Sequence, residues 1–123
     1  KKSNSQMVSF KSEKGTVIDK PIIFLINKGT ASSSEILVLA LQDYLDVTVY
    51  GVASYGKGTV QELITFTDDS ALKLTVGEWL SPSGSSIDGT GITPDVKVIT
   101  SPQDVVNDND PVLNKVLSDI RSK

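Results

Sequence analysis

The sequence contains no cysteine and no histidine among its 123 residues. These two absences exclude disulfides, thiolate nucleophiles, zinc sites built from Cys and His, and every mechanism that uses an imidazole as the base. Acid–base chemistry near neutral pH would have to use Lys, Asp, Glu, Tyr or the N-terminal amine. The lack of cysteine does not fix the compartment, because cytosolic and exported proteins can both lack it.

An excess of basic charge and a long hydrophobic run are also missing. Lys and Arg number 12 against 15 Asp and Glu, so the net charge is −3 and nucleic acid is not an expected partner. The longest apolar run, Ile36–Leu41, is far shorter than the roughly 20 residues that cross a bilayer. No signal-peptide pattern opens the chain, and the polar residues 1–6 resemble the cut end of a fragment. With 38% hydrophobic residues, we expect one compact domain or a piece of one.

The first half of the chain has the pattern of a strand, a helix and a second strand. Pro21–Asn27 is apolar and β-branched, which suits a strand buried on both faces. Ser32 and Glu35 have the spacing of a capping box and predict a helix start. Residues 36–45 are apolar around most of the helix, so we expect it to be covered on several sides. Val47–Gly51 predicts the next strand, which completes a parallel, right-handed βαβ unit.

The second half changes to a period of two residues. Thr59–Phe66 and Ala71–Leu80 predict two strands joined by a turn at residues 67–70. Near the N-terminus, Val8 and Phe10 alternate with polar residues as one short strand would. A Gly/Ser/Pro loop, a linker-like stretch and a helix started by Asp-Pro are predicted at residues 81–95, 100–109 and 110–121.

Three adjacent serines lie in the predicted turn between the first strand and the helix. In one interpretation, Ser32 or Ser33 is an N-cap that accepts hydrogen bonds from backbone N–H groups. In the other, a nucleophilic serine lies at the helix N-terminus, where free N–H groups and the helix dipole stabilise a developing oxyanion. The residues of this turn leave both interpretations open.

Lys57 lies between two glycines in a segment that nearly matches the phosphate-binding loop. We reject nucleotide binding, because Gly58 stands where Ser or Thr should hold magnesium and because a strand, not a helix, is predicted to follow. Lys57 is then either a solvated turn residue or a neutral general base. A base requires its pKa to fall from about 10.4 to about 7–8, which demands burial with no carboxylate beside it. Ser plus Lys is the main serine chemistry open to a chain without histidine.

Three ordered blocks of sequence carry a resemblance to a known family. They are Pro21–Asn27 with Gly29–Ile36 and Ala40–Asp43, then Gly51 with Tyr55–Gln61, and finally Leu74–Thr75, Ser81–Gly84, Ile87 and Gly91–Asp95. Together these blocks resemble the carboxyl-terminal processing peptidases, also called tail-specific proteases. The resemblance extends over about residues 20–98.

The resemblance implies roles for three residues. Ser32 corresponds to the nucleophile, Lys57 to the general base 25 positions later, and Gln61 to a residue that helps to hold the lysine. Ser33 stands where the family usually has alanine, and Thr30 where serine is common. No metal or organic cofactor is implied.

The expected contact between Lys57 and Gln61 requires a bend in the chain. A straight strand would separate these residues by about 13 Å, so we expect a bend at Gly58.

The resemblance also implies a fold and a setting. The fold is α/β, an incomplete crotonase and Clp-protease-like sheet with a βαβ unit plus a β-hairpin. Residues 1–123 are expected to be the C-terminal fragment of a serine peptidase domain, with a family-like core at about 20–98 and a C-terminal helix at about 110–121. The implied activity is serine endopeptidase cleavage near the C-termini of protein substrates, by an extracytoplasmic enzyme that is exported or membrane-anchored.

Expected partners are substrate tails, the upstream half of the catalytic domain with its Asp-Leu-Arg…Gly-Gly segment, and a PDZ-type domain. The fragment alone is expected to show little or no activity.

Two alternatives remain open. In the first, the chain is a non-catalytic binding or assembly module and Lys57 is a charged turn residue. In the second, the fragment forms a homo-oligomer through exposed sheet edges. Tyr55 is expected to line the site, and Trp79, in the second hairpin strand, is expected in the core or at an oligomer contact. Four aspartates without ligand spacing are predicted to be solvated rather than metal-binding: Asp43, Asp68, Asp69 and Asp88.

Overall fold

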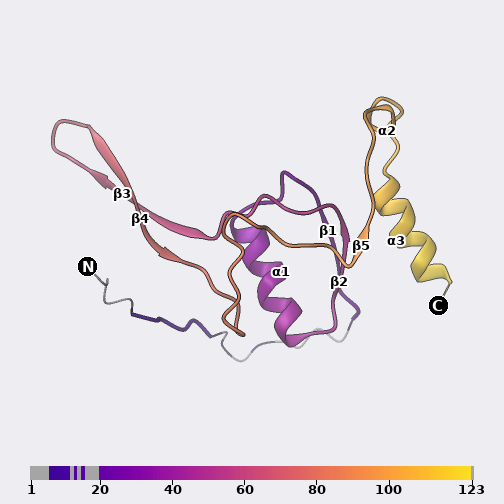
Figure 1. The fold of residues 1–123 in the computed structure, drawn as a ribbon, viewed down its shortest axis with the longest axis horizontal. Coiled ribbons are helices and arrows are strands. Elements are labelled where there is room, and N and C mark those ends of the chain that lie inside the picture. The colour runs from indigo at the N-terminus through magenta and orange to yellow at the C-terminus, as the bar shows by residue number, and fades with distance from the viewer. Residues whose placement is uncertain (1–5, 12, 14, 16–19, 123) are drawn as a thin grey trace.

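A computed structural model describes residues 6–11, 13, 15 and 20–122. The central part is a parallel sheet with one helix beside it, the hairpin extends from one end, and two helices lie at the other end (Figure 1). In chain order the elements are β1 Ile23–Ile26, α1 Ser33–Tyr44, β2 Thr48–Gly51, β3 Thr59–Thr65, β4 Ala71–Glu78, β5 Val96–Lys97, α2 Pro102–Val106 and α3 Pro111–Arg121.

The predicted βαβ unit is confirmed. Strands β1 and β2 are parallel, with Ile23 opposite Thr48 and Ile26 opposite Gly51, and helix α1 connects them. The short strand β5 pairs with the other side of β2, so the sheet order is β1-β2-β5. Gly51 has φ 125°, and a Cβ there would lie 1.9 Å from the carbonyl oxygen of Ile26. Only glycine therefore fits where the ends of β1 and β2 approach each other.

A small hydrophobic core lies between α1, the sheet and the loop of residues 81–95. Its buried members are Ile26, Val38, Val49, Ile87 and Ile92. Full burial of an aliphatic side chain of this size contributes about 1.5–3 kcal/mol to folding. The loop supplies two of the five members, so it is part of the core and not only a connection.

The predicted burial of β1 and α1 is wrong for the described part of the chain. Strand β1 is an edge of the sheet, and Leu25 remains 44% exposed. On α1 only Glu35 and Val38 are buried, whereas Leu37 is 54% and Tyr44 is 73% exposed. The apolar pattern is real, but the described residues place nothing over these faces.

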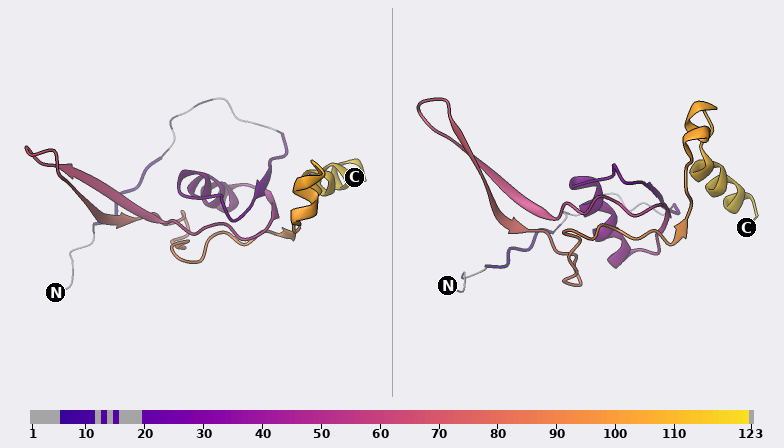
Figure 2. Two further views of the ribbon diagram at one scale, coloured as in Figure 1. Left: turned by 90° about the horizontal axis from the view of Figure 1, so that it is seen from above. Right: turned by 45° about the horizontal axis from the view of Figure 1, so that its top comes forward.

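The predicted hairpin is confirmed, with its strands one and two residues shorter than expected. Strands β3 and β4 are antiparallel, from the pair Thr59 and Glu78 to the pair Thr65 and Ala71. The hairpin extends away from α1 and the parallel sheet in both views of Figure 2. Trp79 therefore follows β4 rather than lying in it, and it is half-buried.

In the C-terminal part, the predicted helix is confirmed, and the predicted linker is wrong. Helix α3 begins after Asp110, whose carboxylate accepts hydrogen bonds from the N–H groups of Val112 and Leu113. The stretch predicted as a linker contains α2, because Ser101 and Asp104 form a capping box at its start. No helix in the described ranges is long and apolar enough to span a membrane.

The strand predicted around Val8 and Phe10 is wrong. Residues 6–11 have no regular structure and are exposed, and neither Val8 nor Phe10 pairs with another strand. The ring of Phe10 lies 5.7 Å from that of Trp79, so Phe10 makes a side-chain contact instead of a backbone pairing. Most of the remaining residues of this segment lie outside the described ranges.

Candidate active site

Ser32 is the N-cap of α1 and has an unusual backbone conformation. Its φ is 58° and its ψ is −121°, a region that costs a non-glycine residue about 1–3 kcal/mol. A strained turn between a strand and a helix also holds the nucleophile in the α/β-hydrolase elbow. Ser32 is half-buried, whereas Ser33 and Ser34 are exposed in the first turn of α1. The three serines are therefore not equivalent, and Ser32 alone has the strained backbone.

The predicted capping box is present, with one strong contact. The backbone N–H of Ser32 donates a hydrogen bond of 2.8 Å to Oε2 of Glu35. The Ser32 hydroxyl occupies the position of a cap near the N3 amide but makes no capping hydrogen bond in the described structure. Ser32 thus has the position of an N-cap while its hydroxyl makes no described hydrogen bond, so the two interpretations of this turn do not exclude each other.

Glu35 connects Ser32 to the segment that carries Lys57. Its side chain is fully buried, with 0% exposure. Oε1 accepts hydrogen bonds from the Ser54 hydroxyl at 2.5 Å and from the N–H of Gly56 at 2.6 Å. Oε2 accepts from the N–H of Ser32 at 2.8 Å and from the N–H of Lys57 at 2.9 Å. One carboxylate therefore holds the backbones of both candidate catalytic residues.

Two opposing effects act on the Glu35 carboxyl. Desolvation by burial raises its pKa, but the hydrogen bonds from Ser54 and from the backbones of Lys57, Gly56 and Ser32 together lower that pKa below its ordinary value. Hydrogen bonds donated to a carboxylate stabilise the ionised form. Glu35 is therefore an anion whose charge is met by N–H and O–H donors rather than by a cation.

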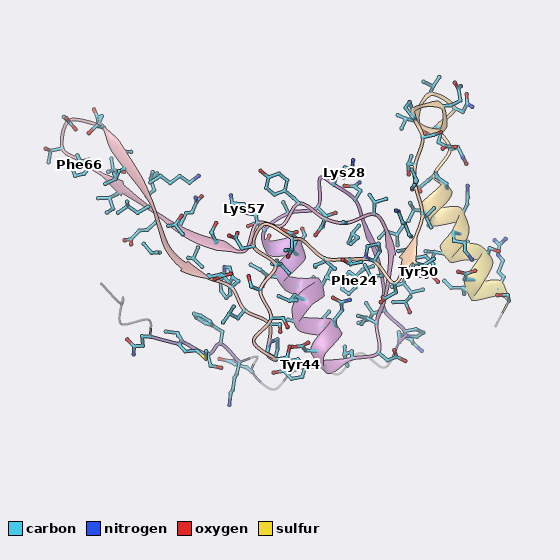
Figure 3. All side chains as sticks on the ribbon, in the orientation of Figure 1. Phe24, Lys28, Tyr44, Tyr50, Lys57 and Phe66 are labelled. Atoms are coloured by element: carbon cyan, nitrogen blue, oxygen red, sulfur yellow. The ribbon has the colours of Figure 1, made fainter. Side chains whose placement is uncertain are left out.

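Lys57 lies where the hairpin leaves the body of the chain (Figure 3). Its backbone is fixed by Glu35, and its side chain is half-buried. Within the described residues its amine forms no ion pair and no hydrogen bond with the Ser32 hydroxyl. The Lys57 side chain thus forms no ion pair in the described structure, while the Glu35 carboxylate binds the backbone N–H of the same residue.

The structure places Gln61 on β3, exposed and without a described hydrogen bond to Lys57. The pairing of the hairpin has a register shift between Val60 and Gln61, and the bend expected at Gly58 stays a prediction. Gly58 is buried, and its N–H donates to Oδ1 of Asp88 at 3.1 Å. The role predicted for Gln61 stays a prediction.

The remaining residues singled out from the sequence lie around this centre or far from it. Tyr55 precedes the lysine segment and is 67% exposed, and its N–H donates to the carbonyl of Thr30 at 2.9 Å. Asp43 accepts the N–H of Ser83 at 2.6 Å, which ties α1 to the 81–95 loop. Asp68 and Asp69 lie at the hairpin turn. The four aspartates therefore occupy three separate places, because Asp68 and Asp69 share the hairpin turn whereas Asp43 and Asp88 bind Ser83 and Gly58.

Sequence reasoning missed two parts of this site. It identified Glu35 only as half of a capping box, and it gave no role to Ser54 or to the amide of Ile92. The Ser-x-x-Glu spacing was the available signal for Glu35, whereas nothing local pairs Ser54 with a carboxylate 19 positions away.

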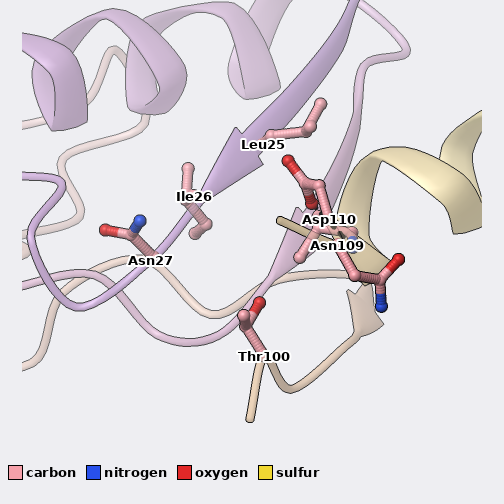
Figure 4. Close-up of a pocket in the computed structure, with 7 residues that line it drawn as sticks. Leu25, Ile26, Asn27, Thr100, Asn109 and Asp110 are labelled. Carbon is pink, nitrogen blue, oxygen red and sulfur yellow. Dashed lines mark hydrogen bonds between the residues drawn. The ribbon is translucent and has the colours of Figure 1, made fainter. Parts of the chain in front are cut away.

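A pocket of about 290 Å³ lies elsewhere, between the end of β1 and the start of α3 (Figure 4). Asn27, Thr100 and Asp110 contribute polar atoms to its wall, and Leu25 and Val112 contribute apolar ones. Neither Ser32 nor Lys57 lines it. The pocket is therefore separate from the candidate catalytic pair.

Comparison with known proteins identifies the family. Residues 1–98 match the model of peptidase family S41. The carboxy-terminal-processing protease of Bartonella bacilliformis is 46% identical over 98 residues, which are 79% of this chain and 23% of that protein. The carboxy-terminal processing protease CtpA of Bacillus subtilis is 43% identical over 94 residues, which are 76% of this chain and 20% of that protein. The chain thus spans about a fifth of the length of these relatives.

Solved structures agree with this match. The photosystem II D1 C-terminal processing protease superposes with a TM-score of 0.61 at 36% identity, over 66% of this chain and 21% of that one. The tricorn protease superposes with a TM-score of 0.69 at 18% identity, over 81% of this chain and 10% of that one, which supports the fold. The fold is α/β and consistent with the Clp-protease-like arrangement. The chain therefore belongs to peptidase family S41, together with the carboxy-terminal processing proteases.

Proposed function

We propose that this chain carries the nucleophile and the general base of a serine endopeptidase that cleaves protein substrates near their C-termini. Ser32 is the nucleophile and Lys57 is the base. The observation that carries the proposal is the shared carboxylate: Glu35 binds the N–H of Ser32 and the N–H of Lys57 on one oxygen atom. This contact places the serine and the lysine segment side by side, although they are 25 positions apart.

In the proposed reaction, the Ser32 hydroxyl attacks the scissile carbonyl carbon and the neutral Lys57 amine accepts its proton. The tetrahedral intermediate then expels the leaving amine, which takes the proton from Lys57. A water molecule, deprotonated by Lys57, attacks the acyl-enzyme, and Lys57 returns that proton to the Ser32 oxygen as the ester bond breaks and the new carboxyl terminus leaves. This sequence needs no metal or organic cofactor.

The oxyanion requires donors other than the Ser32 amide, because that N–H is already bound to Glu35. The backbone N–H of Ser33, the first residue of α1, has no intrahelical acceptor and follows the nucleophile directly. The residue after the nucleophile supplies an oxyanion donor in the α/β-hydrolase elbow as well. We assign the Ser33 N–H to this role, with a second donor from the Asp-Leu-Arg…Gly-Gly segment expected upstream.

The setting of the reaction belongs to the same proposal. The chain would form the C-terminal part of a longer, extracytoplasmic protease whose upstream half and PDZ-type domain complete the substrate site. Gln61 would help to hold Lys57 once the site is complete. The chain by itself would then have little or no activity, and its match to about a fifth of its relatives supports this view.

The proposal is tested by separate substitutions in the longer protease, with cleavage of a peptide substrate as the readout. Ser32→Ala and Lys57→Ala should each lower kcat by about a thousandfold or more. Ser34→Ala and Lys28→Ala, which change exposed residues near the same turn, are the matched controls. Wild-type proteolysis in either of the first two variants would contradict the dyad and favour a non-catalytic binding module.

A further inference from the structure

We propose that Ser54 is a positioning residue of this active site, whose hydroxyl connects the loop around Ile92 to Glu35 and thereby fixes Ser32 and Lys57. The inference rests on the proposed function, and it assigns a role to the Gly91–Asp95 motif that the proposed reaction leaves unused.

The Ser54 hydroxyl is used as donor and acceptor at the same time. It donates to Oε1 of Glu35 at 2.5 Å and accepts from the N–H of Ile92 at 2.7 Å. The backbone N–H of Ser54 also donates to the carbonyl of Ile92 at 3.1 Å. The side chain is 8% exposed, so water does not readily replace either contact.

The loop on the other side of Ser54 is held at close range. Gly91 has φ 69°, and a Cβ there would lie 2.5 Å from the carbonyl oxygen and 2.9 Å from the hydroxyl of Ser54. Ile92, the next residue, is a buried member of the core. The buried Ile92 therefore holds the Ser54 hydroxyl in place, and that hydroxyl in turn holds the Glu35 carboxylate.

Ser54 differs from the other three donors to Glu35. Those three are backbone N–H groups, of Ser32, Gly56 and Lys57, which a side-chain substitution leaves in place. Removing the Ser54 hydroxyl takes one donor from a buried anion and leaves the Ile92 amide without its acceptor. A buried group left without its partner is costly, so the carboxylate must move or take up a proton more readily. Either response displaces the N–H groups that it holds.

The sign of the pH effect follows from the donor that is lost. The hydrogen bond from Ser54 lowers the pKa of Glu35, so Ser54→Ala should raise that pKa. The ionisable residues of the segment that binds Glu35 are Tyr55 and Lys57, and Asp88 binds the N–H of the adjacent Gly58. None of them is changed by the substitution.

Two measurements test the inference. In the 123-residue chain, the carboxyl ¹³C signal of Glu35 should titrate at a higher pH in Ser54→Ala than in the wild type. In the longer protease, Ser54→Ala should lower kcat by about tenfold with KM changed by less than about twofold, because the geometry of the reacting groups is disturbed and not the substrate surface. Ser81→Ala is the matched control, since that serine is equally buried at 7% and bonds to Ser83 and Ser85 instead.

The outcomes are distinguishable. An unchanged Glu35 titration in Ser54→Ala, an unchanged kcat, or an equal loss of kcat in Ser81→Ala would overturn the inference. If Ser54→Ala does not fold, Ser54→Cys carries the test, because a thiol is a weaker donor at the same place. A wild-type Glu35 titration in Ser54→Cys would then overturn it. The NMR readout does not depend on activity, so failure of the proposed dyad cannot be mistaken for failure of this inference.

Discussion

The loops around Glu35 and the β3–β4 hairpin are opposite in character. The loops have no regular structure, yet they contain buried residues such as Ser54, Gly56 and Gly58, and their polar groups converge on one carboxylate. The hairpin has a regular ladder of paired residues, yet every residue of β4 is exposed. Regular secondary structure is thus not what marks the fixed part of this molecule.

The difference has a physical origin. An isolated two-stranded hairpin is marginally stable in water, because its backbone bonds are made without burial of an apolar face. The loops bury their side chains in the core and satisfy a buried anion, so their conformation is linked to the folding of the whole. The site geometry is therefore encoded within this chain, whereas the apolar side chains of the hairpin, among them Leu63, Leu72 and Leu74, have no cover in the described structure.

The contrast between the loops and the hairpin is tested first at two glycines, where we expect the largest change in the free energy of unfolding. Gly51→Ala should destabilise the chain by about 4 kcal/mol, because the added Cβ would meet the Ile26 carbonyl in a backbone conformation unsuited to alanine. Gly77→Ala in the hairpin is the matched change, since its Cβ would meet Val60 at an ordinary 3.7 Å. Urea unfolding should place Gly77→Ala within about 1 kcal/mol of the wild type. Equal losses in both variants would contradict the contrast.

The second effect concerns the buried carboxylate. Glu35→Gln should destabilise the chain by about 3 kcal/mol. In the wild type the N–H groups of Ser32 and Lys57 donate to one carboxylate oxygen, whereas in the variant the NH₂ group of the amide, which is itself a donor, would face two N–H groups. Glu62→Gln, on exposed β3, is the control and should change the free energy of unfolding by less than about 0.5 kcal/mol. A Glu35→Gln variant as stable as the control would show that the network does not hold the loops.

A smaller effect is expected from pH. The pKa of Glu35 in the folded chain lies below its ordinary value of 4.5, so its contribution to stability is present above about pH 4.5 and is lost as the pH falls through the folded value. The pKa values of Asp43, Asp68 and Asp104 are lowered as well and add to the same trend. Urea midpoints measured from pH 7 to pH 3 should therefore fall less steeply in Glu35→Gln than in the wild type. Parallel curves would contradict the assignment.

The sequence predicted the elements whose signals are local. An apolar β-branched run, a capping box and an Asp-Pro start gave β1, α1 and α3, and strict alternation gave the hairpin. The pattern could not show that Leu25 and Leu37 are exposed, because burial depends on what lies opposite. The sequence prediction also missed the short helix α2, although Ser101 and Asp104 form a capping box at its start, as Ser32 and Glu35 do at the start of α1.

For the candidate site, the resemblance predicted Ser32 and Lys57, but it could not predict the contacts that hold their backbones. The positive φ of Ser32 and the bond between Ser54 and Glu35 arise from tertiary packing between segments far apart in the chain. Propensity describes neighbours along the chain, so these features needed the structure.

The central claim is that Ser32, and not one of its two neighbours, is the nucleophile activated by Lys57. The most direct measurement is mass spectrometry of the longer protease after reaction with a fluorophosphonate, an electrophile that modifies activated serines. We expect one adduct, on Ser32, and its loss in Lys57→Ala. An adduct on Ser33 or Ser34, or undiminished labelling in Lys57→Ala, would contradict the account.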